Sequence, residues 1–135
     1  MDKVNKLIYF LIAIQNYCKD IHYNAKGDAF YSMHILADRI QENIYDNIDK
    51  IKEVCFLGTD EKPLKSSEYL TKASKLIPDI KEDDKESFKE LRKLIVEALK
   101  NLNSIKSATK GEDNLYGSIA EDLQGSLGLI NRQIK

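Results

Sequence analysis

The sequence has little histidine, tryptophan, proline or glycine. Its 135 residues include two histidines and no tryptophan, together with two prolines and six glycines. Residues that interrupt helices are therefore scarce, and this scarcity favours long helices. The 21 Lys and Arg residues nearly balance the 22 Asp and Glu residues, for a net charge of −1. This balance excludes a strong overall positive potential for binding nucleic acid.

Cysteine and long apolar runs are also scarce. The two cysteines, Cys18 and Cys55, lack metal-type spacing and form no disulfide framework, so we expect free thiols in a reducing cytoplasm. The longest apolar run near the N-terminus, "LIYFLIAI" at residues 7–14, falls short of the roughly 20 residues that span a membrane. It also lacks a small-residue cleavage site. We therefore expect a cytoplasmic protein without a signal peptide or membrane segment.

Apolar residues recur at helical spacing in four segments of the chain. The pattern predicts helices at about residues 3–25, 29–57, 84–110 and 113–133. Gly27, Gly58 and Gly111 are expected to end the first three. The connection over residues 58–83 holds Pro63 and Pro78, and its stretch "SSEYLTKASKL" predicts a short helix.

Several helix starts carry capping signals. Asp28 is expected to cap the second long helix, and Ser66 or Ser67 the short one. Asp83 followed by Glu86 predicts a capping pair at the third long helix. Four long helices with one long connection between the second and third predict one all-α domain over residues 1–135. Its expected fold is the ferritin-like four-helix bundle, whose long crossover contains the short helix.

Four polar residues share one stripe of the second helix. With His34 at zero, Asp38 falls at about 40°, Asp49 at about 60° and Glu53 at about 100° on a helical wheel. Imidazole nitrogen with carboxylate oxygen suits iron, manganese or zinc. Chance alignment on a solvated helix face would explain the same stripe.

His22 adds to this pattern because it precedes the tight "KGD" turn. An antiparallel pair of helices brings His22 near His34 and Asp38, so three potential ligands are expected to converge. Asp38 and Asp49 lie about 16 Å apart along one helix axis. One ion cannot reach both pairs within one chain, whereas an antiparallel second copy would place its Asp49 and Glu53 opposite the other three residues and form two identical sites.

These residues resemble the Dps family of mini-ferritins. "HYNAKGDAF" followed by "HILAD" and "DKIKEVCFLG" fits the family pattern without a gap from His22 to Gly58, and "PLKSSEYLTKAS" resembles the family's crossover helix. The resemblance covers about residues 15–76 well. Elsewhere it is limited to the helix pattern.

The resemblance implies a hollow twelve-subunit shell with ferroxidase centres at its two-fold interfaces. His22, His34 and Asp38 of one subunit and Asp49 and Glu53 of its partner would be the metal ligands and catalytic residues. Iron(II) would be oxidised there to iron(III), with hydrogen peroxide or dioxygen as oxidant, and stored as ferric mineral. Whether one or two irons bind per site stays open.

The sequence departs from the family pattern at several positions. Tyr23 replaces the usual tryptophan, and packing is its expected role. Gly117, Gly125 and Gly128 interrupt the last helix, which close helix packing or a remodelled subunit contact would explain. Four acidic residues could line an iron access pore, although solvent exposure explains them equally: Glu112, Asp113, Glu121 and Asp122.

DNA binding is not expected, because only "MDK" precedes the first helix and the chain ends in "NRQIK" without a Lys-rich tail. Two other functions remain open. One is a ferritin-like oxidase that acts on an organic substrate beside the metal. The other is a catalytically weak ferritin-like structural or shell protein, or a helical dimer, that retains the metal site.

Overall fold

The chain folds into helices joined by turns and loops in a computed structural model that describes residues 1–135. No strand is present, which confirms the all-α class. The elements are α1 (Asp2–Asn24), α2 (Phe30–Gln41), α3 (Ile44–Lys52), the π-helix η1 (Glu53–Leu57), α4 (Ser66–Ser74), α5 (Asp84–Asn103) and α6 (Lys110–Gln133).

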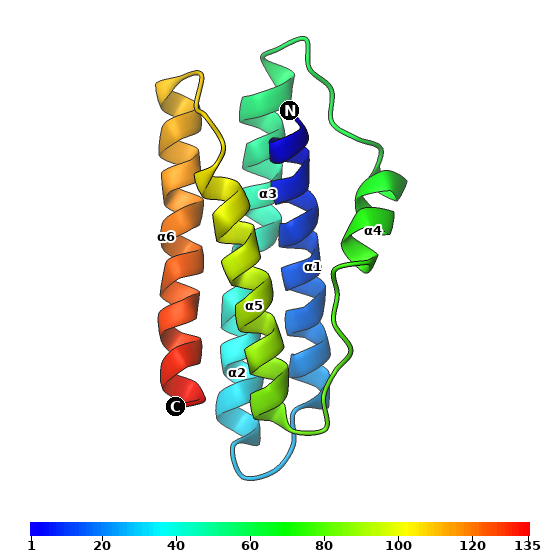
Figure 1. Cartoon of the computed structure of the whole chain (residues 1–135), viewed down its shortest axis with the longest axis vertical. Coiled ribbons are helices and arrows are strands. Elements are labelled where there is room, and N and C mark those ends of the chain that lie inside the picture. The colour runs from blue at the N-terminus through cyan, green and yellow to red at the C-terminus, as the bar shows by residue number, and fades with distance from the viewer.

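The long helices lie side by side along one axis (Figure 1). The segment α2–α3–η1 runs antiparallel to α1, and the connection that contains α4 then returns along the length of the molecule. As a result α5 runs parallel to α2 and α3, and α6 runs antiparallel to α5. None of these helices combines the length and apolar character that crossing a membrane requires.

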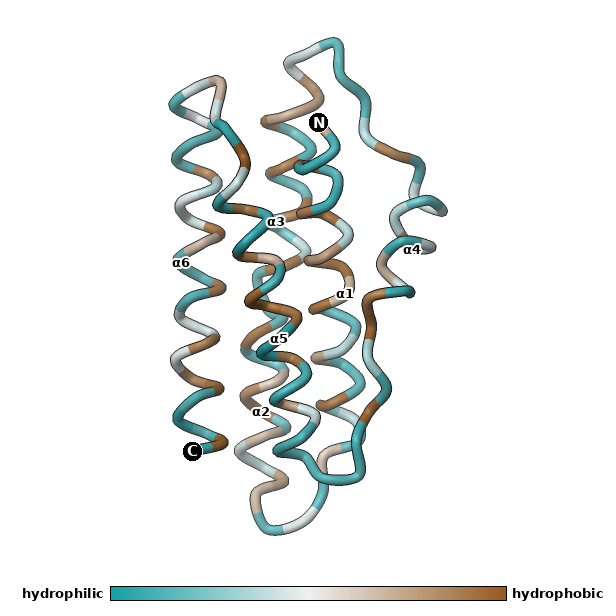
Figure 2. Tube along the Cα trace, viewed as in Figure 1, coloured by the Kyte–Doolittle hydropathy of each residue, from teal (hydrophilic) through white to brown (hydrophobic).

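The helix α1 lies at the centre of the packing because its apolar residues cover more than one face. It contacts α2, α3, α4 and α5. Its inward side chains are fully or almost fully buried, and Figure 2 shows apolar segments of α1 and α5 at the centre of the molecule. Each buried aliphatic side chain contributes about 1.5–3 kcal/mol of hydrophobic stabilisation. The most buried residues of α1 are Leu7, Ile8, Leu11, Ala13, Ile14, Tyr17, Cys18 and Ile21.

The second long helix is interrupted, so the predicted single helix over residues 29–57 is wrong in detail. A turn at Glu42 and Asn43 separates α2 from α3, and the Glu42 N–H bonds the Arg39 carbonyl three residues back. Asparagine favours turns over helix interiors because its side chain competes for backbone groups. The apolar spacing of Ile40 and Ile44 continues across the turn, which is why the spacing did not indicate it.

Gly111 does not end the third long helix, contrary to prediction. The helix α5 ends at Asn103, and Gly111 lies in the first turn of α6. The Thr109 hydroxyl accepts a bond from the Glu112 N–H, and the Glu112 carboxylate accepts bonds from the N–H groups of Ala108 and Thr109. This reciprocal capping box defines the start of α6.

The other predicted caps have mixed outcomes. The Asp83 carboxylate accepts from the Lys85 N–H and caps α5 as predicted, but the Glu86 carboxylate pairs with a lysine side chain instead. Lys65 precedes α4, so neither serine caps it. Ala29, not Asp28, precedes α2. Gly27 has a φ of +90°, as a left-handed turn residue should.

The long connection is attached to α1 through a buried tyrosine. The Tyr69 hydroxyl of α4 donates to the Asn5 side-chain oxygen over 2.5 Å and accepts from the Leu64 N–H over 3.1 Å. Lys52 lies 4.9 Å above the ring of Tyr69. These contacts link the connection to both α1 and the end of α3.

Both cysteines are free and buried, which agrees with the prediction of thiols. Burial raises the pKa of Cys18, and the Asp38 carboxylate adds to this effect. Burial also raises the pKa of Cys55, whose sulfur lies 3.2 Å from the Tyr116 hydroxyl. Both side chains therefore remain protonated at neutral pH.

The capping box predicts that Glu112 contributes to stability. Glu112→Ala leaves the N–H groups of Ala108 and Thr109 without their carboxylate acceptor and should lower the free energy of unfolding by about 1 kcal/mol. Urea denaturation measures this change. Glu121→Ala is the control, because Glu121 is exposed and makes no hydrogen bond or ion pair, and it should change stability by less than about 0.5 kcal/mol. Equal effects of the two variants would contradict the capping role.

Candidate metal centre

The turn between α1 and α2 brings the two histidines into direct contact. The ring centroids of His22 and His34 lie 3.6 Å apart, with an angle of 15° between the ring planes. His22 belongs to the last turn of α1, and His34 to the second turn of α2. The sequence prediction that these two residues meet is therefore confirmed.

Each histidine is oriented by the backbone of the other. His22 Nδ1 lies 2.8 Å from the His34 carbonyl oxygen, and His34 Nδ1 lies 2.6 Å from the His22 carbonyl oxygen. A carbonyl oxygen can only accept a hydrogen bond, so each Nδ1 must carry the proton. Each neutral ring then keeps its lone pair on Nε2. A histidine that donates Nδ1–H to a carbonyl has the orientation typical of metal ligands.

Two aromatic rings extend this pair on either side. The Tyr23 ring meets the His22 ring edge to face at a centroid distance of 5.0 Å, and the Phe30 ring stacks on His34 at 5.1 Å. Tyr23 was expected to have a packing role; its ring packs against His22, but the side chain is 75% exposed and is not part of the core. Phe30 was missed as a residue of the site, although its position four residues before His34 places both on one helix face.

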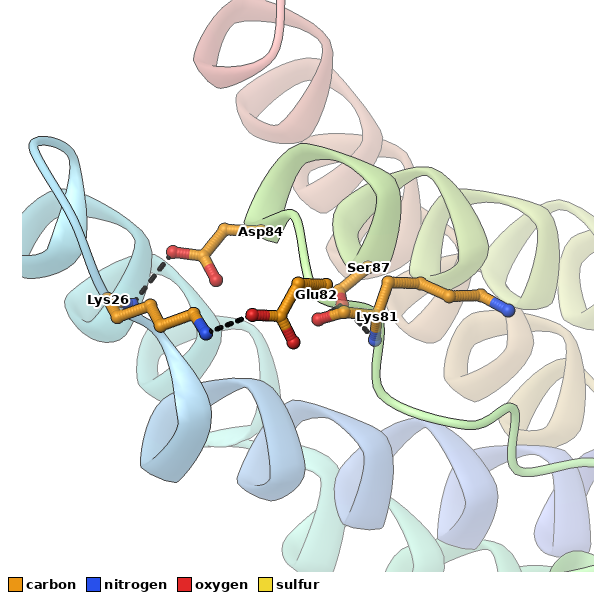
Figure 3. Close-up of polar contacts among 5 residues, drawn as sticks. All are labelled: Lys26, Lys81, Glu82, Asp84 and Ser87. Carbon is orange, nitrogen blue, oxygen red and sulfur yellow. Dashed lines mark hydrogen bonds and ion pairs between the residues drawn. The ribbon is translucent and has the colours of Figure 1, made fainter.

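Polar contacts attach the turn between the two histidines to the segment at the start of α5 (Figure 3). The Lys26 N–H donates to the Asp84 carboxylate over 2.9 Å, and the Lys26 ammonium donates to Glu82 over 2.6 Å. The ion pair is highly exposed, so its own contribution is small. The bond from the Lys26 backbone to Asp84 ties the turn to the first residue of α5.

Asp38 does not join the two histidines in a three-ligand group. No group of three or more His, Cys, Asp or Glu side chains in the chain is arranged to hold a metal ion. Asp38 is exposed one turn beyond His34, where its carboxylate accepts from the Gln41 amide over 3.1 Å. The expected convergence of three ligands within one chain is therefore not found.

The other two predicted ligands lie at the far end of the rod formed by α2, α3 and η1. Asp49 is in α3, and Glu53 is the first residue of η1, toward the top of Figure 1, whereas α2 lies toward the bottom. Both side chains are exposed, with no hydrogen bond or ion pair to another residue, and both line an open cleft of about 630 Å³. One chain thus carries His22 and His34 at one end of this rod and Asp49 and Glu53 at the other. These two groups, the histidine half and the carboxylate half, do not meet within the chain.

The π-helix that begins at Glu53 has a buried anchor. Its widened turn directs Cys55 inward, toward Tyr116 of α6. Burial, followed by the bond to Cys55, raises the pKa of Tyr116. The π-helix forms the C-terminal end of the helical segment that contains α3, and the predicted ligand Glu53 is its first residue.

Large apolar side chains are exposed on α2 and α3. Tyr31 is 71% exposed and Tyr45 is 73% exposed. Ile35 is also exposed. With His34 at zero on the helical wheel, these three fall at about 60°, 20° and 100°, which is the sector of the predicted ligands. Exposed apolar residues gathered on one face mark an interaction surface.

Three of the four acidic residues considered for an iron access pore form hydrogen bonds within the chain. Glu112 is buried in the capping box, Asp113 accepts from the Ser107 hydroxyl, and Asp122 accepts from the Asn47 amide. A Cβ added at Gly117, Gly125 or Gly128 would meet nothing within 4 Å. Close packing inside the chain therefore does not explain these glycines.

A comparison with models of known protein families finds no match for this chain, and a search of curated proteins finds none either.

The reciprocal histidine bonds predict an unusual tautomer. In their neutral form, both rings should carry their proton on Nδ1 because each Nδ1 faces a carbonyl oxygen. Nitrogen-15 NMR of the two imidazoles distinguishes Nδ1–H from Nε2–H. The same protein unfolded in urea is the internal control and should lose the preference. A folded protein with protonated Nε2 in both rings would contradict this geometry.

Proposed function

We propose that the chain is a ferritin-like ferroxidase of the Dps type, which oxidises iron(II) at sites shared by two subunits and stores ferric mineral in a hollow shell. The single observation that carries the proposal is the oriented His22–His34 pair, which leaves two imidazole Nε2 lone pairs for a metal. The ferritin-like assignment is supported by four long helical segments and by a long connection that contains a short helix.

The register of an antiparallel pair of α2–α3 rods supports the shared site. In such a pair, residues equally distant from the centre face one another. His34 and Glu53 are equally distant from the point between Asn43 and Ile44, and so are Asp38 and Asp49. One register therefore brings His34 opposite the partner's Glu53 and Asp38 opposite the partner's Asp49, because both ligand pairs have the same four-residue spacing.

The same register accounts for the features between the two halves. Tyr45 would face the partner's Glu42 and cover exposed apolar area. The turn at Glu42 and Asn43 would lie at the two-fold axis, where each rod meets its own symmetry-related copy. Isologous contact of this kind forms two identical sites for each pair of subunits.

The ligand set has the chemistry that iron oxidation needs. Two imidazoles and three carboxylates bind iron(II), and the anionic carboxylates favour iron(III) still more. Iron is here the substrate. With hydrogen peroxide as oxidant, the O–O bond breaks, each of two iron(II) ions gives one electron, and two hydroxide ions form. Peroxide consumed in this way cannot react with iron in solution.

A catalytically weak shell or dimer protein is the second candidate. The exposed apolar residues of α2 and α3 support self-association without requiring chemistry. Under this alternative the subunits would associate, but iron oxidation would not depend on the five predicted ligands. Measurements of assembly and of activity therefore separate the two functions.

Assembly is the first test. The purified protein should elute as a shell of about twelve subunits, because the proposed site is incomplete without a two-fold partner. Light scattering after size exclusion measures the mass against the 15.5 kDa of one chain. A stable monomer that oxidises iron at full rate would contradict both the shell and the shared site.

Mixing two inactive variants tests the shared site itself. His34→Ala and Glu53→Ala should each nearly abolish rapid iron oxidation, because each removes one half of the ligand set. In a mixed pair of subunits, one site carries both changes and the other carries neither. Stopped-flow absorbance should therefore recover roughly half of the wild-type rate per mixed pair.

The matched control is Glu97→Gln, which removes an exposed carboxylate of α5 outside the proposed site and should leave the rate unchanged. Subunit exchange is verified by mass spectrometry before the rates are compared. If fully exchanged shells stay as inactive as the two parents, the ligands do not pair between subunits.

A further inference from the structure

An open cleft between α5 and the end of α6 is lined mainly by cations. Its volume is about 460 Å³, within the range of small-ligand pockets. Two of its lining side chains come from the first half of α5, and the others follow at the C-terminal end of α6, which lies beside α5 in Figure 1. The six lining residues are Lys89, Arg92, Asn131, Arg132, Ile134 and Lys135.

Most of this positive charge has no counter-ion. Lys89 pairs with Glu86 over 2.9 Å, but Arg92, Arg132 and Lys135 take part in none of the four ion pairs of the protein. No acidic side chain lines the cleft. If the terminal carboxylate of Lys135 is counted as an anion, the four cationic side chains that line the cleft still outnumber it. The protein as a whole has a net charge of −1, so the cleft is a local concentration of positive charge.

The guanidinium of Arg92 is held in place without being neutralised. Its Nη1 donates to the side-chain oxygen of Asn131 over 2.9 Å. An amide oxygen is a neutral acceptor, so this bond orients the guanidinium but leaves its charge and its other N–H donors for a ligand. Arg92 is half-buried, which reduces the screening of its charge by water.

We infer that this cleft binds a phosphate dianion, either as inorganic phosphate or as the phosphate group of a small phosphomonoester. Guanidinium groups present parallel N–H donors that match the oxygens of phosphate, and such charge-assisted bonds are about twice as strong as neutral ones. Two arginines from different helices, with the lysines beside them, could contact separate oxygens of one tetrahedral anion. The inference does not depend on the proposed iron chemistry.

The size and position of the cleft favour a small anion over a nucleic acid. Binding of a duplex requires a row of cations along many phosphates. On α5, the lysines that follow the cleft are paired with carboxylates: Lys93 with Glu90, and Lys100 with Glu97. The two cations on α5 nearest beyond the cleft are thus neutralised by their own carboxylates, and no row of unpaired cations continues from the cleft along α5.

Calorimetric titration at low ionic strength tests the inference with three probes: inorganic phosphate, glycerol phosphate and a short DNA duplex. Saturable binding of phosphate or glycerol phosphate is expected with a dissociation constant below about 1 mM. Arginine side-chain NMR should show shifts of Arg92 and Arg132 during the titration. Whichever of the two small probes binds more tightly identifies the free or esterified source of the phosphate.

Charge-removing variants locate the site. Arg92→Gln and Arg132→Gln should each weaken phosphate binding by about tenfold, because each removes one charge-assisted contact. Lys93→Gln is the matched control: it removes one charge from the next residue of α5, outside the cleft, and should change affinity less than about twofold. Arg132 is exposed at the end of α6, so its variant tests the site without disturbing the core.

Three results would overturn the inference. The first is the absence of saturable binding by either small phosphate probe. The second is equal weakening by Lys93→Gln and the two arginine variants, which would indicate only a general charge effect. The third is tighter binding of the duplex than of both small probes, which would assign the cleft to nucleic acid.

Discussion

The packing of α1 against α2 and α5 is the contact on which the rest of the structure depends. Residues of α1 from Leu7 to Ile21 are buried without a break in their helical spacing. This continuous burial fixes the direction of α2 and hence the meeting of His22 with His34. The same helix anchors the long connection through Asn5 and Tyr69. The core and the Lys26–Asp84 contact thus position the two histidines.

The rod formed by α2, α3 and η1 imposes the second constraint. Its histidine and carboxylate ends lie at opposite ends of two successive helices and therefore do not meet within one chain. No group of three or more potential metal ligands is therefore complete within one chain. This arrangement makes association a condition of the proposed activity. Exposed Tyr31, Ile35 and Tyr45 lie on the same helices, and the proposed association would cover them.

Much of the fold could be predicted from apolar spacing, because spacing reports which side of a helix is buried. The all-α class, the α1 face and the meeting of the two histidines across the Gly27 turn were predicted correctly. The turn at Asn43 was not, because Ile40 and Ile44 keep the helical spacing across it. The start of α6 was misplaced because Gly111 was given more weight than the "TKGE" capping box around it.

Only those features of the candidate site that depend on positions along a single helix could be predicted from the sequence. Helical-wheel angles place Asp38, Asp49 and Glu53 on the face of His34. They do not determine which neighbouring group an exposed side chain contacts. Asp38 instead accepts a bond from Gln41. The reciprocal carbonyl bonds of the histidines depend on the distance between two backbones, which no spacing rule gives. The stacking of Phe30 on His34 was accessible from their four-residue separation and was missed.

The shared site is tested most directly by anomalous diffraction at the iron edge, on crystals soaked anaerobically with iron(II). The account predicts iron between His22, His34 and Asp38 of one subunit and Asp49 and Glu53 of its two-fold partner. Iron bound within a single chain, or no iron beside the histidine pair in crystals that contain the antiparallel contact, would contradict it.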